Sequence, residues 1–182
     1  MEDMCPKEYQ LNVQIENLLT EKKAVILKKW FELVIETYPS DTAIFIKREK
    51  DPFANPVGNA IYRALEPLFD ELLNKMDHEI ITSFLDPVIR IRAVQTMFTP
   101  SQATSFILFL KYIVREILNK EISKNNIYDQ LLKFESKIDE LCLAAFDIYV
   151  KCREKIYDIK ANEERNKIYS AFARAGLIDE SL

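Results

Sequence analysis

Residues 126–152, NIYDQLLKFESKIDELCLAAFDIYVKC, carry the apolar pattern that decides the fold class. Apolar side chains follow one another at alternating intervals of four and three residues, which is the repeat of a helix that packs along one face. We call these positions the 4-3 seam: Ile127, Leu131, Phe134, Ile138, Leu141, Ala145, Ile148 and Cys152. The 4-3 seam predicts one long helix near the end of the chain.

Two explanations of the 4-3 seam stay open at this point. Six of its members form a candidate interface with a second copy or a partner protein: Ile127, Leu131, Phe134, Ile138, Leu141 and Ile148. Spacing this regular exceeds what a helix needs merely to cover a core, which favours an interface. Burial of the same side chains within their own chain explains the pattern comparably well.

The helical pattern continues beyond the 4-3 seam toward the C-terminus. It passes through a highly charged stretch, residues 160–167, and reaches about Ala173 before Gly176 can end the helix. An unbroken helix from Asn126 to Ala173 would be about 70 Å long, which is more than the diameter of a domain of this size. We therefore expect the far end either to project from the domain or to fold back after a break near Asn162.

The rest of the chain also shows helical periodicity, and the helix-breaking residues fall between the periodic segments. Asn55-Pro56 and Thr99-Pro100 are helix starts, because an Asn or Thr cap precedes a proline in the first helical position. The pattern predicts helices over about 8–19, 21–37, 40–46, 55–75, 79–97 and 101–120, with a break or kink at 86–87. We predict a single all-α domain over residues 1–182, with a core at about 15–155 and a helical extension at 156–182.

The composition excludes several kinds of catalytic site. The two glycines are too few for Gly-rich phosphate loops, and the single histidine cannot build a Ser-His-Asp relay or a multi-His metal site. Cys5, Cys142 and Cys152 lack the C-x-x-C spacing of zinc sites and are an odd number for a disulfide framework. We expect no catalytic residues, no cofactor and no metal.

Charge and hydropathy restrict the partners. The 25 Lys and Arg residues are interleaved with 29 Asp and Glu residues, and the net charge of −4 shows no basic stripe for nucleic acid. The longest apolar run, residues 106–110, is far shorter than the roughly 20 residues of a membrane span. The acidic N-terminus has no apolar secretion segment. These features predict a cytoplasmic protein with neither a membrane span nor a nucleic-acid partner.

Three further residues suggest packing roles. Gly58 lies in the first turn of the helix that begins near Asn55, where we expect the close approach of a neighbouring helix rather than a ligand contact. Arg90 and Arg92 are two residues apart and point to nearly opposite sides of a helix, so at least one lies beside the core. Such an arginine needs carboxylate or carbonyl partners, which favours a structural clamp over an anion-binding site.

Four blocks of sequence resemble the N-terminal domain family of RsbT co-antagonist proteins of the RsbRD type, over approximately residues 15–155. The blocks are Trp30-x-x-x-Val34-x-x-Thr37-Tyr38-Pro39, Phe53-Ala54-Asn55-Pro56-Val57-Gly58, Arg90-Ile91-Arg92-Ala93-Val94-Gln95, and Pro100-Ser101-Gln102-Ala103 followed by Leu110-Lys111-x-x-x-Arg115-Glu116. Within them we take as signature residues Asn55, Pro56, Arg90, Arg92, Gln95 and Ser101.

The resemblance implies a sensory or regulatory input module in bacterial signalling. Related stressosome domains look like globins that bind no haem, pair as dimers and send their last helix toward a partner domain. The family supplies no catalytic residues to carry over. Too few residues follow the resembling region to form the STAS domain of a full-length co-antagonist, so we expect a stand-alone input domain whose output passes through the last helix or a separate chain.

The leading hypothesis is therefore a non-enzymatic, globin-like regulatory module that dimerises or docks a protein partner through its last helix. The alternative is a binding domain for a small apolar or haem-like ligand, in a pocket between the helix at 101–120 and its neighbours. An enzyme ranks third, because it would need a cleft with convergent titratable groups that the sequence does not indicate.

Overall fold

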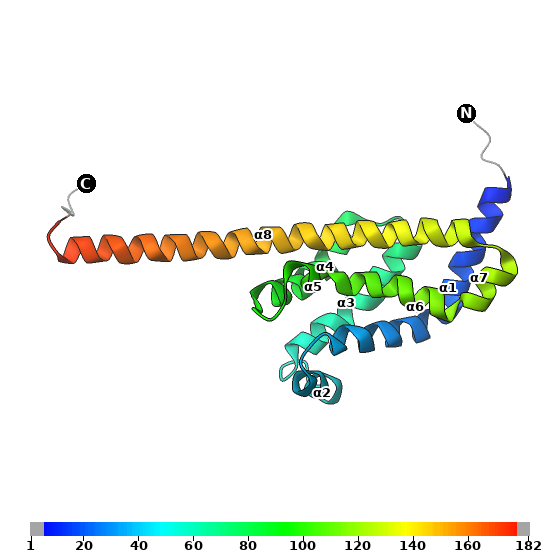
Figure 1. Cartoon of the computed structure of the whole chain (residues 1–182), viewed down its shortest axis with the longest axis horizontal. Coiled ribbons are helices and arrows are strands. Elements are labelled where there is room, and N and C mark those ends of the chain that lie inside the picture. The colour runs from blue at the N-terminus through cyan, green and yellow to red at the C-terminus, as the bar shows by residue number, and fades with distance from the viewer. Residues whose placement is uncertain (1–5, 178–182) are drawn as a thin grey trace.

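A computed structural model describes residues 6–177 of the chain, and over this range it contains helices and no strands (Figure 1). The helices are α1 (Pro6–Glu36), α2 (Ser40–Arg48), α3 (Pro56–Leu73), α4 (His78–Val94), α5 (Pro100–Thr104), the 3-10 turn η1 (Ser105–Leu108), α6 (Phe109–Ile117), α7 (Asn119–Asn125) and α8 (Tyr128–Arg174). The prediction of an all-α fold with a long last helix is confirmed.

The core lies between α8 and the helices beneath it in Figure 1. α8 packs mainly on α4, α3 packs on α4 as well, and α1 contacts both α3 and α6. Trp30 of α1 sits inside this arrangement with no exposed surface, and its indole N–H donates to the carbonyl oxygen of Phe106 at 2.9 Å. α2 lies at the edge of the domain away from α8 (Figure 1).

α8 is unbroken at Asn162 and projects from the domain (Figure 1). Its 47 residues correspond to a length of about 70 Å. Every side chain from Tyr157 to Phe172 is exposed, so this part of the helix has left the body of the domain. Over residues 6–177, no helix combines the length and the apolar character needed to cross a membrane.

Gly176 ends α8 in a Schellman motif, as the sequence predicts. The Leu177 N–H donates to the Phe172 carbonyl at 3.0 Å, and the Gly176 N–H donates to the Ala173 carbonyl at 3.1 Å. Gly176 has a φ of +64°, a left-handed conformation that glycine adopts without the steric cost of a Cβ. The helix therefore stops at a defined residue.

Asn55 caps α3 as predicted, and its side chain explains Gly58. The Asn55 Oδ1 accepts from the Gly58 N–H at 2.8 Å, while its Nδ2 donates to the carbonyls of Ile46 and Glu49, each at 3.0 Å. A Cβ on Gly58 would lie only 2.7 Å from Asn55 Oδ1. The tightest contact at Gly58 is therefore made by its own cap, Asn55, and not by a neighbouring helix.

Two expected interruptions of helices are absent. α1 continues through the boundary predicted at residues 19–21. The Thr20 hydroxyl donates a hydrogen bond of 2.8 Å to the Glu16 carbonyl oxygen in the preceding turn, instead of capping a new helix. α4 runs past Pro87 to Val94 without a break. Because Leu85, Val88 and Ile89 beside Pro87 are all buried, packing holds the helix where proline removes one backbone hydrogen bond.

The single helix predicted over 101–120 is instead divided into α5, η1, α6 and α7. Thr99 caps α5 in a reciprocal capping box with Gln102. The Thr104 hydroxyl then bonds the Pro100 and Ser101 carbonyls at 3.3 and 3.4 Å, and the chain tightens into the 3-10 turn η1. The apolar pattern continues through the turn, which is why periodicity alone does not reveal the division.

Candidate functional site

The six candidate interface residues lie on the core side of α8. Their exposed fractions are 8% or less, so they cover the domain's own interior: Ile127, Leu131, Phe134, Ile138, Leu141 and Ile148. Phe134, for example, packs edge-to-face on Phe69 of α3 with ring centroids 6.4 Å apart. Ile127 precedes the first residue of α8 as its N-cap. The structure therefore shows burial within the same chain, the second explanation of the 4-3 seam.

A second set of apolar side chains lies on the opposite side of α8. We call it the second stripe: Phe146, Val150, Tyr157, Ala161, Ile168 and Phe172. Phe146, Tyr157 and Ile168 are separated by 11 residues, and the other three members repeat with the same period. Eleven residues make three helical turns to within about 20°, so the members line one face.

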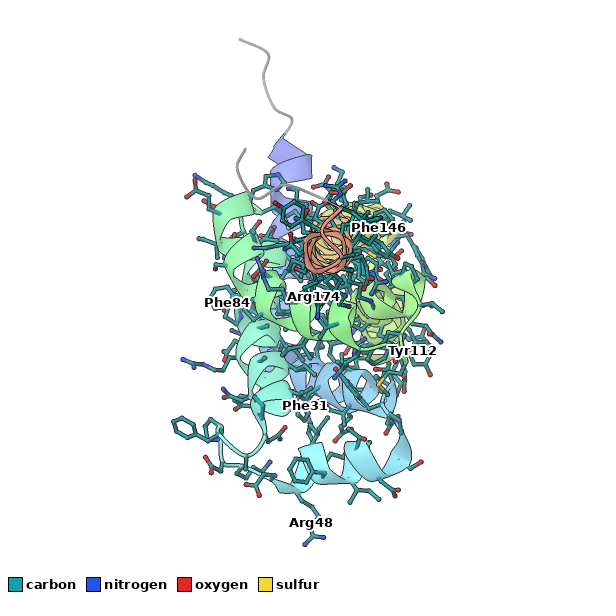
Figure 2. All side chains as sticks on the ribbon, turned by 90° about the vertical axis from the view of Figure 1, so that its left-hand side faces the viewer. Phe31, Arg48, Phe84, Tyr112, Phe146 and Arg174 are labelled. Atoms are coloured by element: carbon teal, nitrogen blue, oxygen red, sulfur yellow. The ribbon has the colours of Figure 1, made fainter. Side chains whose placement is uncertain are left out.

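The second stripe is exposed at every member except Val150, which is half-buried. Exposed fractions are 44% for Phe146, 58% for Tyr157, 55% for Ile168 and 45% for Phe172. Figure 2 looks along α8 and shows Phe146 at the outer edge of the molecule. The stripe begins beside the domain and continues into the projecting part of the helix. The sequence analysis missed the second stripe because the 4-3 seam has more closely spaced apolar residues on the same helix. The sequence does show the stripe, as apolar residues at alternating intervals of four and seven.

Charged side chains of opposite sign flank the second stripe. From residue 147 to residue 160, one flank carries Arg153 and Lys160, and the other carries Asp147, Glu154 and Asp158. Nearer the tip the two signs mix, because Lys167 pairs with Glu164 at 2.7 Å and Arg165 lies on the same side of the helix as Asp147. Arg153 is also fixed to the domain, because its Nη1 donates to the Ala93 carbonyl at 3.1 Å. Its Nη2 donates to the Tyr157 hydroxyl at 3.0 Å, and this bond lowers the pKa of Tyr157. The last buried turn of α8 is thus joined to the first exposed one.

Arg92 is the buried arginine that the spacing of the two arginines predicts, and it has no exposed surface. Its Nη1 donates to the Gln102 carbonyl at 3.1 Å, and its Nη2 donates to the Thr37 hydroxyl at 2.8 Å and to the Val34 carbonyl at 3.4 Å. These partners belong to α5, to the residue after α1 and to the last turn of α1. Arg92 therefore clamps α4 to the C-terminus of another helix.

Three aromatic rings surround the Arg92 guanidinium. Its central carbon lies 4.6 to 5.1 Å from the ring centroids of Tyr38, Phe98 and Phe106. Among the described residues, no carboxylate forms an ion pair with it. Burial lowers the pKa of Arg92 and raises the pKa of the Tyr38 hydroxyl. The rings supply electron-rich faces where a counter-ion would otherwise be needed.

The other signature residues stand at helix ends or on the surface. Arg90 pairs with Asp86 at 2.5 Å within α4, and Gln95 follows that helix as its C-cap. The Ser101 Oγ lies 3.1 Å from the Thr99 Oγ in the first turn of α5. Asn55 and Pro56 begin α3. The structure does not bring these six side chains together into one site.

Between residues 6 and 177, the titratable groups do not form a cluster that could hold a metal ion either. In the described part of the chain, no group of three or more His, Cys, Asp or Glu side chains could hold a metal ion. Cys142 and Cys152 are free thiols, and burial raises the pKa of both. Cys5 lies outside the described residues. His78 is exposed at the start of α4.

Comparison with known families decides the classification. The model of the RsbT co-antagonist protein rsbRD N-terminal domain matches residues 24–163. The chain belongs to this family. The match contains the six signature residues of this RsbRD N-terminal domain, and it ends inside the projecting part of α8, so the start of that projection is part of the family domain.

A protein of Archaeoglobus fulgidus described as uncharacterized is 26% identical over 106 residues. The alignment covers 57% of this chain and 66% of that protein, which is just under two thirds of the relative's length. No solved structure matches the chain significantly. Membership in the RsbRD N-terminal domain family places the chain among stressosome-related regulatory signalling domains, which are sensory or regulatory rather than known catalysts.

Proposed function

We propose that this RsbRD N-terminal domain is a non-enzymatic signalling module that acts through α8, and that α8 pairs with α8 of a second copy. The observation that carries the proposal is the second stripe, an exposed apolar face that repeats every 11 residues from Phe146 to Phe172. Exposed apolar surface costs about 25 cal/mol per Å² relative to burial, which favours association. Exposed apolar side chains that repeat along a projecting helix are typical of an interaction surface.

A second copy is the partner that the repeat fits best. The same stripe on another α8 offers apolar side chains at matching heights, so the two helices can lie against each other over several turns. An 11-residue period corresponds to about 3.67 residues per turn, and it produces nearly straight pairs with a slight right-handed supercoil. The straight course of α8 in Figure 1 agrees with such a pairing.

The charges beside the second stripe favour a parallel pair. In a parallel pair, the basic flank of one helix faces the acidic flank of the other, which brings Arg153 of one copy toward Asp158 of the second. An antiparallel pair would instead place like flanks together. The 4-3 seam takes no part in this proposal, because a dimer through its buried side chains would require the core to open.

The decisive experiment is to place a charge on each side of the projecting helix. Ile168→Glu puts a carboxylate in the second stripe, whereas Ile159→Glu puts one on the opposite side at a similarly exposed position. We expect the wild type to dimerise, Ile168→Glu to dissociate at least about tenfold more readily, and Ile159→Glu to match the wild type. Analytical ultracentrifugation over a range of concentrations measures all three.

A wild type that stays monomeric at tens of micromolar would overturn self-pairing. Equal effects of the two substitutions would also contradict it, because only one lies in the stripe. If the wild type is a monomer while a different protein binds the helix and is lost with Ile168→Glu, then the stripe is a docking face for that partner and not for a second copy.

A further inference from the structure

A groove runs along the domain between α1 and α3, and α2 and the segment after it lie at one end. The larger part has a volume of about 810 Å³, and an adjoining hollow of about 340 Å³ shares Phe31, Lys50 and Tyr62 with it. Phe31 lies between α8 and α2 in Figure 2. From Thr20 to Glu32 the groove follows α1 for about 18 Å. The size is that of a small-molecule site.

The lining of the groove is apolar along its centre. Ala24, Leu27 and Phe31 contribute from α1, and Tyr62 and Leu65 from α3. Phe31 and Tyr62 meet edge-to-face with ring centroids 6.1 Å apart where the two parts of the groove join. Tyr62 is 72% exposed, so its ring and hydroxyl are available from solvent. An elongated hydrocarbon would bury these side chains.

Lysines stand at the rim of the groove, and two of them have no ion-pair partner among the described residues. Lys23 is held by Glu66 at 2.9 Å and Asp70 at 2.7 Å, and Lys47 lies 3.4 Å from Glu36. Lys28 and Lys50 have no carboxylate within ion-pair distance in the part of the chain described. They enter from α1 and from the segment after α2.

Acidic side chains on the same rim limit the charge of a ligand. Glu21, Glu32, Glu49 and Glu66 equal the four rim lysines in number, so a nucleotide or a polyphosphate would meet as much repulsion as attraction. A single negative charge beside Lys28 and Lys50 is compatible with this balance. The apolar centre and the two lysines therefore specify an amphipathic monoanion.

We propose that the groove binds a free fatty acid, with its carboxylate beside Lys28 and Lys50 and its hydrocarbon chain over Ala24, Leu27 and Leu65. The groove lies away from the residues around helix 101–120, where the sequence hypothesis placed a ligand pocket. This inference is independent of pairing through α8, since none of the groove's lining residues belongs to that helix.

The test is calorimetric titration of the 182-residue chain with dodecanoate below its micelle concentration, with dodecanol as the uncharged comparison. Ala24→Phe narrows the groove from an exposed position, and Val25→Phe is the matched control, because Val25 is also exposed but does not line the groove. Lys50→Gln removes one of the two unpaired charges. Thermal unfolding of each variant establishes that it is folded.

We expect one dodecanoate per chain, binding weakened about tenfold or more by Ala24→Phe and by Lys50→Gln, and binding by Val25→Phe like the wild type. No binding by the folded wild type would overturn the proposal, and so would equal effects of the two phenylalanine variants. Dodecanol binding as tightly as dodecanoate would refute the role of the lysines. The Ile168→Glu variant is expected to bind dodecanoate normally, which separates this proposal from the pairing of α8.

Discussion

Arg92 brings a guanidinium into the core, and no carboxylate of residues 6–177 forms an ion pair with it. The planar guanidinium of Arg92 bonds two different helix regions at once. Its Nη1 donates to the Gln102 carbonyl and its Nη2 donates to the Thr37 hydroxyl. A lysine has a single ammonium on a flexible stem and cannot hold both positions while lying flat between aromatic rings. The burial of this side chain therefore depends on the shape of arginine as well as on its charge.

We predict that Arg92→Lys lowers the free energy of unfolding by about 2–4 kcal/mol, because a buried charge would lose part of its hydrogen bonding. Arg90→Lys is the matched control two residues away, and the ion pair of Arg90 with Asp86 lies on the surface. Its replacement should leave the free energy of unfolding close to that of the wild type, because exposed ion pairs contribute little to stability. Urea unfolding monitored by circular dichroism compares the two variants. Equal losses would contradict the clamp.

At the scale of the helix, α8 has two apolar faces that differ in burial. Leu141, in the 4-3 seam, has no exposed surface, whereas Leu143, one turn before Phe146, is 66% exposed. We predict that Leu141→Ala lowers the free energy of unfolding by about 2–5 kcal/mol through the cavity it leaves. Leu143→Ala should change it by less than about 0.5 kcal/mol.

Both variants should be measured by urea unfolding in the Ile168→Glu background, so that any pairing of α8 does not add to the apparent stability. A large loss with Leu143→Ala would mean that this side of α8 is packed in the monomer. The second stripe would then have less exposed apolar surface than the structure shows.

The sequence predicts helices best where a local cap determines them. Asn55, Thr99 and Gly176 each act within one helical turn, so their roles follow from neighbouring residues alone. The boundaries that differ from prediction, at Thr20 and around Thr104, depend on whether a hydroxyl caps a helix or bonds back to the previous turn. That choice is made by packing from distant segments.

The candidate interface also depends on contacts between distant segments, which the sequence pattern does not predict. A 4-3 repeat indicates that a helix buries one face. It does not indicate whether the surface that covers this face belongs to the same chain or to another chain. Only the positions of α3 and α4 beneath α8 answer that question. The groove between α1 and α3 joins residues about 40 positions apart, such as Ala24 and Leu65, so no local motif predicts it. The likeness to globins stays a prediction.

At the scale of the whole molecule, parallel pairing makes a geometric prediction. In a parallel pair the two copies of Phe172 lie at the same height, whereas an antiparallel pair centred on the second stripe would separate them by about 40 Å. We therefore expect Phe172→Cys to form a disulfide-linked dimer on mild oxidation, detected on a non-reducing gel.

Ser170→Cys is the matched control for this cross-link, since residue 170 is exposed on the opposite side of the same turn. The wild type controls for the three native thiols, at positions 5, 142 and 152. Efficient cross-linking of Ser170→Cys, or none of Phe172→Cys in a protein that ultracentrifugation shows to be dimeric, would contradict the parallel arrangement.

The continuity of α8 makes the projecting segment a lever. The helix has no proline and no glycine between its buried part and its tip, so it has no hinge at which motion could be absorbed. The arm from Arg153 to Arg174 is about 32 Å long, and a tilt of about 5° where Arg153 meets the domain would move the tip by roughly 3 Å. A small repacking beneath the 4-3 seam is thereby converted into a larger displacement at the far end.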